Sequence, residues 1–453
     1  MNDAEGASRV HVVVVGAGIA GLAAAHDLHR AGLSVTVLEA QSWPGGRMTT
    51  QPLPAGGRME RGAQFLTTAY RTLPRLIRES GLEASVRPVT ERTLLVTPEG
   101  RRAVNPTSPV SLLRSGVLGA GDVLGALRAQ RRLGALARAL PPDDLGAWAD
   151  LDDVTGGQWA EQNLPKSLHE RLLKPAVHGF YFQTLAENSG ALLAAVASMS
   201  SRPGHVVTLD GGLGALTAAL AGPLHVRYGT AVDTVRVTAD GARVDTSAHG
   251  SVHADAVILA APGAAALSIL ADATDLERKL MATSYSPGLL VGVTLERALH
   301  AVECAGAYGV LIAPDDGEGL AAIAIGSRTD QRPARREQSE VVTAMLAAPA
   351  AGRLRNASDQ EVTSETIEML GRHLPGLGTR VKGSHVVHWD QAMPHTPVGR
   401  AHDVARYRSE LAVNARVVLA GDYLGFPWTD SAAFNGVWAA RHVLASLRPG
   451  SAL

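Results

Sequence analysis

The sequence contains very little cysteine: Cys304 is alone among 453 residues. A single cysteine cannot form an intrachain disulfide, which excludes the small disulfide-stabilised folds of secreted proteins. The acidic opening MNDAE also lacks the basic region that begins a secretory signal. These absences predict a reducing compartment, and we expect the protein in the cytoplasm.

The sequence also lacks long apolar runs and an excess of charge of one sign. Its longest apolar stretches, such as residues 256–270, fall short of the ~18 uncharged residues of a spanning helix, and Pro262 and Gly263 interrupt this one. Lys plus Arg number 42 against 43 for Asp plus Glu, so no net field attracts nucleic acid. We expect no nucleic-acid partner and no membrane association, although the amphipathic residues 110–140 leave docking on a membrane surface as an alternative.

The chain has enough apolar material for a large core, with 46% hydrophobic and 19% charged residues. Residues 10–15 (VHVVVV) show no alternation, which is typical of a strand buried on both faces of a parallel sheet. Residues 19–30 have a helical pattern closed by Gly32, and residues 34–38 form a second apolar run. The N-terminal region is therefore predicted to form a β-α-β unit.

The turn between the first strand and the helix carries Gly16, Gly18 and Gly21, the dinucleotide-binding fingerprint. In that pattern the first glycine makes the tight turn, the second lets the backbone approach a pyrophosphate, and the third lets the helix pack on the strand. Glu39 ends the second strand, where a carboxylate accepts hydrogen bonds from an adenosine ribose and repels a 2′-phosphate. The unit is predicted to bind a dinucleotide other than NADP.

Gly45, Gly46 and Arg47 follow after a short loop, and supply flexible backbone and a guanidinium that can fork onto pyrophosphate oxygens. The run from the fingerprint through Glu39 and Ala40 to Arg47 resembles the FAD-dependent amine oxidase superfamily, which includes monoamine oxidases, protoporphyrinogen oxidases, renalases and carotenoid desaturases. Residues 60–65 (ERGAQF), 229–235 and 419–422 (LAGD) match the same family. The resemblance implies one bound FAD.

The resemblance also assigns roles to later residues. In the family, the residue at the place of Val232 holds the adenine through its backbone, and the Asp at the place of Asp422 binds the ribityl or pyrophosphate region. Residues 431–436 (SAAFNG) stand where the family has Gly-Ala-x-x-Ser-Gly, a looser match at a helix start that would stabilise reduced flavin. The implied FAD-binding residues are Gly16, Gly18, Ile19, Ala20, Gly21, Glu39, Ala40, Gly46, Arg47, Gly62, Ala63, Gln64, Phe65, Val232, Gly421, Asp422, Ser431, Ala432 and Ala433.

The fold class that follows is α/β, with a Rossmann-like FAD-binding domain interleaved with an α+β substrate-binding domain. After about residue 65 the pattern changes, and residues 112–140 and 145–200 are largely helical. Strand signals return at residues 206–209, 224–228, 232–237 and 256–260, where we expect the nucleotide domain to resume. The predicted segments are 8–70, 203–275 and 386–449 for the FAD-binding domain, and 71–202 and 276–385 for the substrate-binding domain.

Aromatic residues make up only 4% of the chain, yet one segment concentrates them near the flavin motif, which predicts the substrate site there. By register with the family, Trp428 falls where monoamine oxidases keep a cage tyrosine, and Trp389 matches a tryptophan before the flavin-facing loop. His395 is a third candidate catalytic residue. The alternatives are a core tryptophan for Trp428 and, favoured for His395, a surface histidine. The concentrated aromatics are Tyr423, Phe426, Trp428, Phe434 and Trp438.

Two departures from the family affect the chemistry. Residues 288–295 correspond to the strand on which monoamine oxidases place a lysine near flavin N5, and Val291 stands at that position, which puts a lysine–water relay to oxygen in doubt. No cysteine lies near the flavin-facing segments, so the FAD is expected to be non-covalent. No metal site is predicted.

The predicted function is hydride removal from a small organic substrate, through amine C–N oxidation or ring desaturation, with O2 as the final acceptor. Residues 284–287 (SYSP) and 393–399 (MPHTPVG) favour the protoporphyrinogen-oxidase-like branch. The alternatives are a redox-neutral flavin isomerase or mutase, a porphyrinogen- or carotenoid-type desaturase, and a non-catalytic FAD-stabilised binding protein. The expected partner is a small-molecule substrate, and the expected state is a monomer or homodimer.

Overall fold

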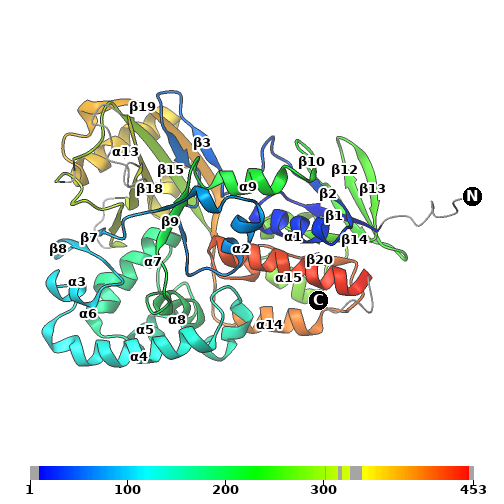
Figure 1. Cartoon of the computed structure of the whole chain (residues 1–453), viewed down its shortest axis with the longest axis horizontal. Helices are drawn as coiled ribbons and strands as arrows, with labels where there is room; N and C mark the ends of the chain where they lie inside the picture. The colour runs from blue at the N-terminus through cyan, green and yellow to red at the C-terminus, as the bar shows by residue number, and fades with distance from the viewer. Residues whose placement is uncertain (1–9, 301, 315–318, 327–338, 448–453) are drawn as a thin grey trace, which may run out of the picture.

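The computed structural model describes residues 10–300, 302–314, 319–326 and 339–447. In Figure 1 a parallel sheet lies at the right, a larger sheet at the upper left, and a group of helices below the larger sheet. The opening segment on which the prediction about a secretory signal rests lies outside the described residues. Within the described ranges, no helix has both the length and the apolarity that crossing a membrane requires.

The five-stranded sheet is parallel throughout, and its strands come from three distant parts of the chain. The predicted helix α1 (Ile19–Arg30) is confirmed between its first two strands. Val12 and Val14 are buried on one face of β1 and Val13 and Val15 on the other, which explains the unbroken valine run. In spatial order the strands are β10 (His225–Arg227), β2 (Ser34–Leu38), β1 (His11–Val15), β14 (Ala256–Leu259) and β20 (Val417–Leu419).

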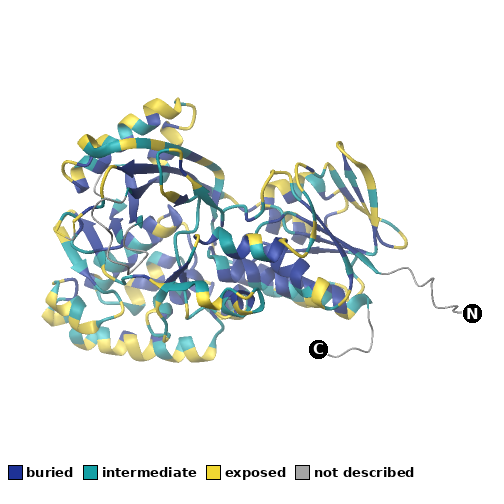
Figure 2. Ribbon diagram, turned by 45° about the horizontal axis from the view of Figure 1, so that its top comes forward, coloured by how far each residue is buried: buried dark blue, intermediate teal, exposed yellow. Residues whose placement is uncertain are grey.

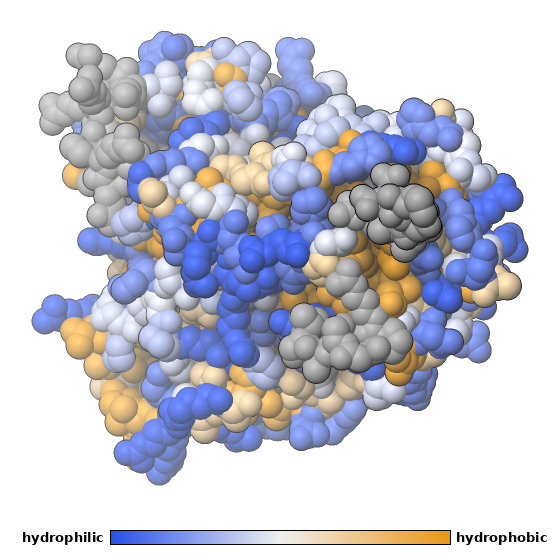
Figure 3. All heavy atoms as spheres, turned by 45° about the vertical axis from the view of Figure 1, so that its right-hand side comes forward, coloured by the Kyte–Doolittle hydropathy of each residue, from blue (hydrophilic) through white to orange (hydrophobic). Residues whose placement is uncertain are grey.

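Each face of the parallel sheet is covered, and buried residues dominate its strands (Figure 2), except in the edge strand β10. One face packs on α1, α2 (Thr72–Glu79), α9 (Gly214–Ala221) and α15 (Thr429–Leu447). The other packs on a small antiparallel sheet and further helices. Its elements are β11 (Thr234–Val237), β12 (Ala242–Thr246), β13 (Gly250–Ala254), α10 (Gly263–Ile269), α11 (Asp275–Met281) and α14 (Arg400–Glu410). From the side of this sheet, hydrophilic residues cover much of the surface and hydrophobic residues gather in patches among them (Figure 3).

The seven-stranded sheet is antiparallel except where β16 pairs with β7. One face packs on α12 (Ala348–Arg353) and α13 (Asp359–His373), and the other faces Phe65, Phe182 and Met393. The order is β19 (Val381–Pro394), β15 (Tyr285–Leu295), β18 (Glu340–Leu346), β17 (Leu320–Ile325), β16 (Gly309–Ile312), β7 (Thr93–Thr97) and β8 (Gly100–Val104).

The helices predicted between residues 112 and 200 are present. The side chains of α8 are apolar all round and buried, whereas α4 buries Ala129 and Leu133 and exposes Leu124 and Leu127. These helices are α3 (Pro109–Arg114), α4 (Val123–Ala139), α5 (Gly156–Asn163), α6 (Lys166–Leu168), α7 (Lys174–Tyr181) and α8 (Gly190–Met199).

Two predicted strands form outside the five-stranded parallel sheet. β9 (Val206–Leu209) pairs with β5 (Leu66–Thr67) and β6 (Val86–Pro88), and β11 belongs to the small antiparallel sheet. A separate hairpin joins β3 (Thr50–Pro52) to β4 (Arg58–Glu60). The domain boundary expected at residue 386 falls inside β19, a strand of the seven-stranded sheet. The remaining boundaries stay predictions.

Candidate functional site

Two glycine loops lie together at the start of α1. Gly16 has a φ of +101° and its amide donates to Leu38 O at 2.8 Å, so the chain turns sharply after β1. Gly45 N donates to Ala17 O at 2.8 Å, which brings the second loop against the first. A Cβ on Gly18 would meet no atom within 4 Å, and one on Gly46 would meet only the Cα of Gly18, at 3.7 Å. The loops thus form a side-chain-free cradle beside the amides of the helix N-terminus.

Glu39 is fixed beside this cradle. Its carboxylate accepts from Ala17 N at 2.7 Å and from Gln41 N at 2.8 Å. The backbone carbonyl of Glu39 accepts from Thr230 N at 2.8 Å, which holds the segment carrying Val232 against the end of β2. The exposed Ala40 follows at the same end. The structure therefore brings the predicted adenosine-side residues to one edge of the parallel sheet.

Arg47, Asp422 and Tyr285 form one polar network. Nη1 of Arg47 lies 2.6 Å from Asp422 Oδ2 and donates to Ala392 O at 2.6 Å. The hydroxyl of Tyr285 donates to Asp422 Oδ1 at 3.2 Å and accepts from Gly263 N at 3.2 Å. Burial lowers the pKa of Arg47, but the Asp422 charge brings the net pKa above its usual value, so the guanidinium stays charged. Sequence reasoning used Tyr285 only as part of residues 284–287 and assigned it no contact with the flavin motifs.

The segment from Gly62 to Phe65 runs beside Arg47. Ala63 N donates to Arg47 O at 3.0 Å, and a Cβ on Gly62 would lie 2.3 Å from that oxygen, so the approach requires glycine. The Tyr308 hydroxyl donates to Gln64 O at 2.8 Å. The predicted flavin motif is thus held by Arg47 on one side and by a residue of the larger sheet region on the other.

Phe65 belongs to an aromatic wall that sequence reasoning missed. Its ring packs edge-on to Phe180 with centroids 5.6 Å apart, and edge-on to Tyr308 at 6.2 Å. Phe180 lies on α7, is 39% exposed, and packs on Tyr181 at 6.3 Å. An exposed aromatic ring beside a cofactor motif is typical of a substrate contact. No local signal could have found this wall, because Phe65, Phe180 and Tyr308 lie more than 100 residues apart in sequence.

Two of the three predicted catalytic residues occupy defined positions near these motifs. The indole Nε1 of Trp389 donates to Arg61 O at 2.6 Å, one residue before Gly62. His395 Nδ1 lies 3.1 Å from Ser284 Oγ and its Nε2 lies 3.7 Å from Glu187 Oε1. The side chain of His395 is 16% exposed, so it is not a fully solvated surface histidine.

Trp428 is less accessible than a cage residue with both ring faces open to a substrate would be. Its ring stacks on Phe426 with centroids 4.5 Å apart and an interplanar angle of 11°, so one face is covered. Its Nε1 is buried and makes no hydrogen bond within the described part of the chain. The predicted aromatic concentration does not form a single wall, because Phe434 and Trp438 pack instead on Arg408 at 5.3 and 5.4 Å.

The start of α15 is buried and tightly bonded. Ser431 Oγ donates to Asp143 O at 2.6 Å and accepts from Phe426 N at 2.9 Å, while Ala432 and Ala433 are buried. Asp430 accepts from the first amides of α2, and burial raises the pKa of its carboxyl to about 6 although these hydrogen bonds oppose the shift. Sequence reasoning missed Asp430. The amides that it accepts are Arg71 N, Thr72 N and Leu73 N.

A cavity of about 720 Å³ lies beyond the loop that carries His395. Glu187, which contacts His395, lines it together with Gln183, whose Nε2 donates to the carbonyls of Met393 and Pro394. Its far wall comes from α12 and α13 and includes Arg353. The end of β19 and His395 therefore contact both the lining of this cavity and, through Ala392 O, the Arg47 network.

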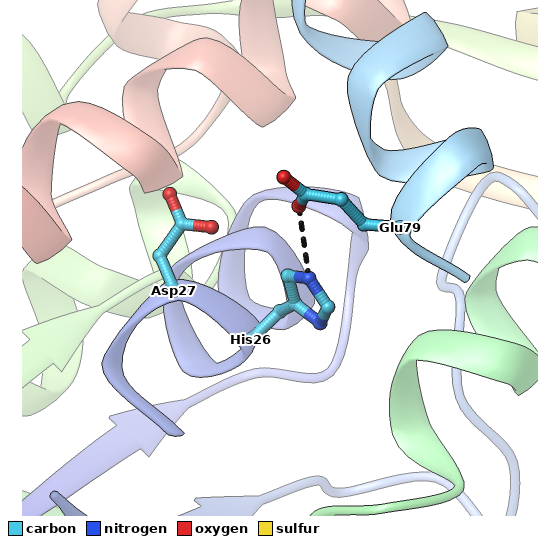
Figure 4. Close-up of side chains that lie close together, drawn as sticks. All are labelled: His26, Asp27 and Glu79. Carbon is cyan, nitrogen blue, oxygen red and sulfur yellow. Dashed lines mark hydrogen bonds and ion pairs between the residues drawn. The ribbon is translucent and has the colours of Figure 1, made fainter. Parts of the chain in front are cut away.

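His26, Asp27 and Glu79 form the one group of three possible metal ligands that the described residues bring together (Figure 4). His26 Nε2 lies 3.1 Å from Glu79 Oε2. Nη1 of Arg75 lies 2.9 Å from Asp27 Oδ1 and 2.9 Å from Glu79 Oε2, so a guanidinium already stands between the carboxylates. We interpret the group as ion pairs joining α1 and α2, and the absence of a metal site stays a prediction.

Comparison with known proteins relates this arrangement to flavoenzymes. A family model described as flavin containing amine oxidoreductase matches residues 19–444. Protoporphyrinogen oxidase 2, chloroplastic/mitochondrial, of Arabidopsis thaliana is 36% identical over 115 residues, 25% of this chain and 22% of that protein. Human lysine-specific histone demethylase 2 is 41% identical over 96 residues, 21% of this chain and 11% of that protein. The matches span less than a quarter of either relative.

The likeness of fold extends over nearly the whole chain. Cyclohexylamine oxidase from Brevibacterium oxydans superimposes with a TM-score of 0.74 over 97% of this chain and 100% of that chain, at 20% sequence identity. The predicted α/β fold, with a Rossmann-like part and a substrate-binding part, is thereby confirmed.

Proposed function

Because the chain belongs to the family of flavin-containing amine oxidoreductases, we propose that it binds FAD without a covalent bond and takes a hydride from an amine or from a ring that becomes desaturated. The observation that carries the proposal is the cradle of Gly18 and Gly46, flanked by Glu39 on one side and by the Arg47–Asp422 pair on the other. Their order along one sheet edge fits a ribose, a pyrophosphate and a ribityl chain.

The chemistry of the surrounding residues fits FAD. Glu39 supplies a fixed carboxylate for ribose hydroxyls, and the open backbone at Gly18 admits a pyrophosphate. The buried Nε1 of Trp428 is a donor without a partner among the described residues, and a bound cofactor or substrate would supply its acceptor. When bound, the flavin would supply the acceptor for the hydride, which carries both electrons of the oxidation.

A non-covalent flavin is supported by the placement of the lone cysteine. Cys304 is fully buried in the apolar cluster that contains Met369 and Leu370, on the α13 face of the seven-stranded sheet. Phe65 and Tyr308 pack on the opposite face. A thioether between Cys304 and a flavin beside Phe65 would therefore have to pass through the sheet.

The same geometry changes the interpretation of Val291. Its side chain is buried in the Cys304 cluster, so it points away from the proposed site. Side chains alternate along a strand, and the inner face of β15 carries Gly288, Leu290 and Gly292. No lysine occupies that face of β15, which adds to the doubt about a lysine–water relay to oxygen.

The substrate is proposed to bind against Phe65, Phe180 and Tyr308. An apolar wall holds a neutral amine or ring by contact and excludes water, and hydride transfer to a flavin needs no strong base when a nitrogen lone pair provides the driving force. His395, held by Ser284 and Glu187, is proposed to accept or deliver a proton. Trp428 would orient the substrate or flavin through its N–H, and Trp389 would hold the Gly62 segment.

A second candidate function is porphyrinogen or carotenoid-type desaturation, favoured by the similarity to protoporphyrinogen oxidase 2. We also propose O2 as the final electron acceptor, a cytoplasmic location and a monomeric or homodimeric state. The proposed FAD-binding domain comprises residues 8–70, 203–275 and 386–449, and the proposed substrate-binding domain comprises residues 71–202 and 276–385. The single buried cysteine supports the location.

The test begins with the absorbance spectrum of the purified protein before and after acid precipitation, followed by anaerobic addition of amines, cyclic imines and porphyrinogens. Released FAD, with bleaching by one substrate that air reverses, would support the oxidase and identify the substrate class. Activity that requires dithionite-reduced protein and forms no peroxide would show an isomerase instead. A colourless protein that binds no added FAD would overturn the proposal.

A further inference from the structure

Tyr285 connects the two sheets at the proposed flavin site. It is the first residue of β15 and pairs with Pro394, the last residue of β19, so it lies at one end of the seven-stranded sheet. Its hydroxyl reaches Asp422, which follows β20, and Gly263, which follows β14. β14 and β20 are neighbours in the parallel sheet, and nucleotides bind at the carboxyl ends of such strands.

The hydroxyl makes both of its hydrogen bonds across the junction. It accepts from Gly263 N and donates to Asp422 Oδ1, each at 3.2 Å. Burial and the nearby Asp422 charge both raise the pKa of Tyr285, so the hydroxyl keeps the proton that it donates. A phenylalanine at this position would leave the ring in place and remove both interactions.

A second connection reaches the same carboxylate from the neighbouring strand. Nη1 of Arg47 bonds both Asp422 Oδ2 and Ala392 O, and Ala392 lies in β19 beside β15. Each carboxylate oxygen of Asp422 is therefore held by a group that contacts the seven-stranded sheet region. A carboxylate oxygen can accept more than one hydrogen bond, so both retain capacity for a ligand.

We propose that Tyr285 is a positioning residue that fixes Asp422 for the flavin and makes flavin affinity depend on the docking of the seven-stranded sheet. The inference rests on the proposed function, because it takes Asp422 to be a flavin contact. It goes beyond that function in assigning to a residue of β15, outside every flavin motif, control over the cofactor.

The experiment compares Tyr285→Phe, Asp422→Asn and the double variant in the full-length protein, by titrating flavin-depleted protein with FAD. We expect Tyr285→Phe to raise the FAD Kd about tenfold, the cost of one hydrogen bond to a charged group. The double variant should bind no more weakly than Asp422→Asn, because Tyr285 acts through that carboxylate. A merely structural role would give additive losses.

The matched control is Tyr407→Phe, which also removes a buried tyrosine hydroxyl, one that accepts from Leu419 N at 2.9 Å and has no role in the proposed site. Its FAD Kd should equal that of the wild type. An unchanged Kd in Tyr285→Phe, or additive losses in the double variant, would overturn the inference while the proposed function stands. A wild type that binds no FAD would overturn the proposed function itself.

A measurement on the wild-type protein tests the proposal even if a variant does not fold. FAD loading should slow hydrogen exchange at the Gly263 amide, which donates to Tyr285, because the flavin would hold Asp422 and thereby the hydroxyl in place. Unchanged exchange at Gly263 on loading would count against the coupling.

Discussion

Gly18 and Gly21 are three residues apart and differ in the space that surrounds them. An added Cβ at Gly21 would lie 1.9 Å from Gly16 O, a contact that the backbone must move to relieve. At Gly18 the same atom would enter open space, and the φ of −68° suits any L-residue. The fold therefore requires Gly21, whereas the proposed cofactor requires Gly18.

Substituting each of these glycines should separate folding from FAD binding. Gly21→Ala should destabilise the protein by about 2–3 kcal/mol, the usual cost of overpacking, measured as the free energy of unfolding in urea. Gly18→Ala should unfold like the wild type but lose most FAD affinity in a fluorescence titration, because its methyl group would occupy the pyrophosphate path. Normal FAD affinity in Gly18→Ala would show that the cradle does not bind the pyrophosphate.

Phe180 provides a residue-scale test of the substrate wall. Its ring packs on Phe65 and is 39% exposed, so truncation removes contact area for a ligand with little loss of core packing. Phe180→Ala should raise KM for a cyclic or aromatic amine about tenfold and leave kcat within about twofold, as expected for a contact made equally in ground and transition states. Steady-state kinetics would measure both. Val413→Ala, at a distant exposed valine, is the control and should change neither constant.

At the scale of elements, α2 and α15 are joined by one buried carboxylate. Asp430 lies at the start of α15 and accepts the first amides of α2, a helix capped from outside its own sequence. Because burial raises its folded-state pKa to about 6, the folded protein holds a proton that the unfolded chain releases near pH 4. The stability that the protonated Asp430 carboxyl contributes to the folded state is fully present below about pH 4. It is lost as the pH rises towards and through 6.

The stability of the wild type should therefore fall relative to Asp430→Asn between pH 4 and pH 7, by on the order of 2 kcal/mol. Chemical denaturation of both proteins across this range measures the difference. Asp143, whose pKa burial also raises, lies close to Asp430 and titrates in both proteins, so it largely cancels in the comparison. A difference that does not change with pH would show that Asp430 is ionised throughout.

Local sequence signals predicted elements whose partners are close in the chain. The valine run of β1, the glycine loop and α1 all follow from side-chain periodicity and turn chemistry within 30 residues. β9 was predicted as a strand, but its pairing with β5 and β6 was not predicted. A strand pattern indicates which face is buried but does not identify the hydrogen-bonding partner.

The residues of the candidate site fall into the same two groups, those that local motifs predict and those that only the fold brings together. Gly16, Glu39, Arg47 and Asp422 belong to motifs with fixed spacing, and the structure brings them to one sheet edge. Phe180, Tyr308 and Tyr285 reach the site from the larger sheet and its helices, where no spacing rule applies. The covered face of Trp428 also depends on its neighbour Phe426, whose ring orientation no sequence pattern specifies.

At the scale of the whole molecule, one cofactor would contact segments from both ends of the chain and thereby stabilise the folded state as a unit. Added FAD should raise Tm with concentration, by an amount equivalent to about 2.7 kcal/mol when FAD is 100 times its Kd. FMN lacks the adenosine that Glu39 is proposed to hold and should raise Tm far less. Thermal unfolding with each nucleotide measures this, and equal shifts would contradict the role of Glu39.

The parallel sheet takes its central strand from residues near the start of the chain and an edge strand, β20, from residues 417–419. α15 follows β20 and packs so closely on α1 that a Cβ at Gly436 would lie 1.9 Å from Ala20 O. During synthesis, residues 417–447 must therefore leave the ribosome before this layer can close. Until then the side of α1 that contacts α15 stays uncovered, and exposed apolar surface of this kind makes an incomplete chain prone to aggregation.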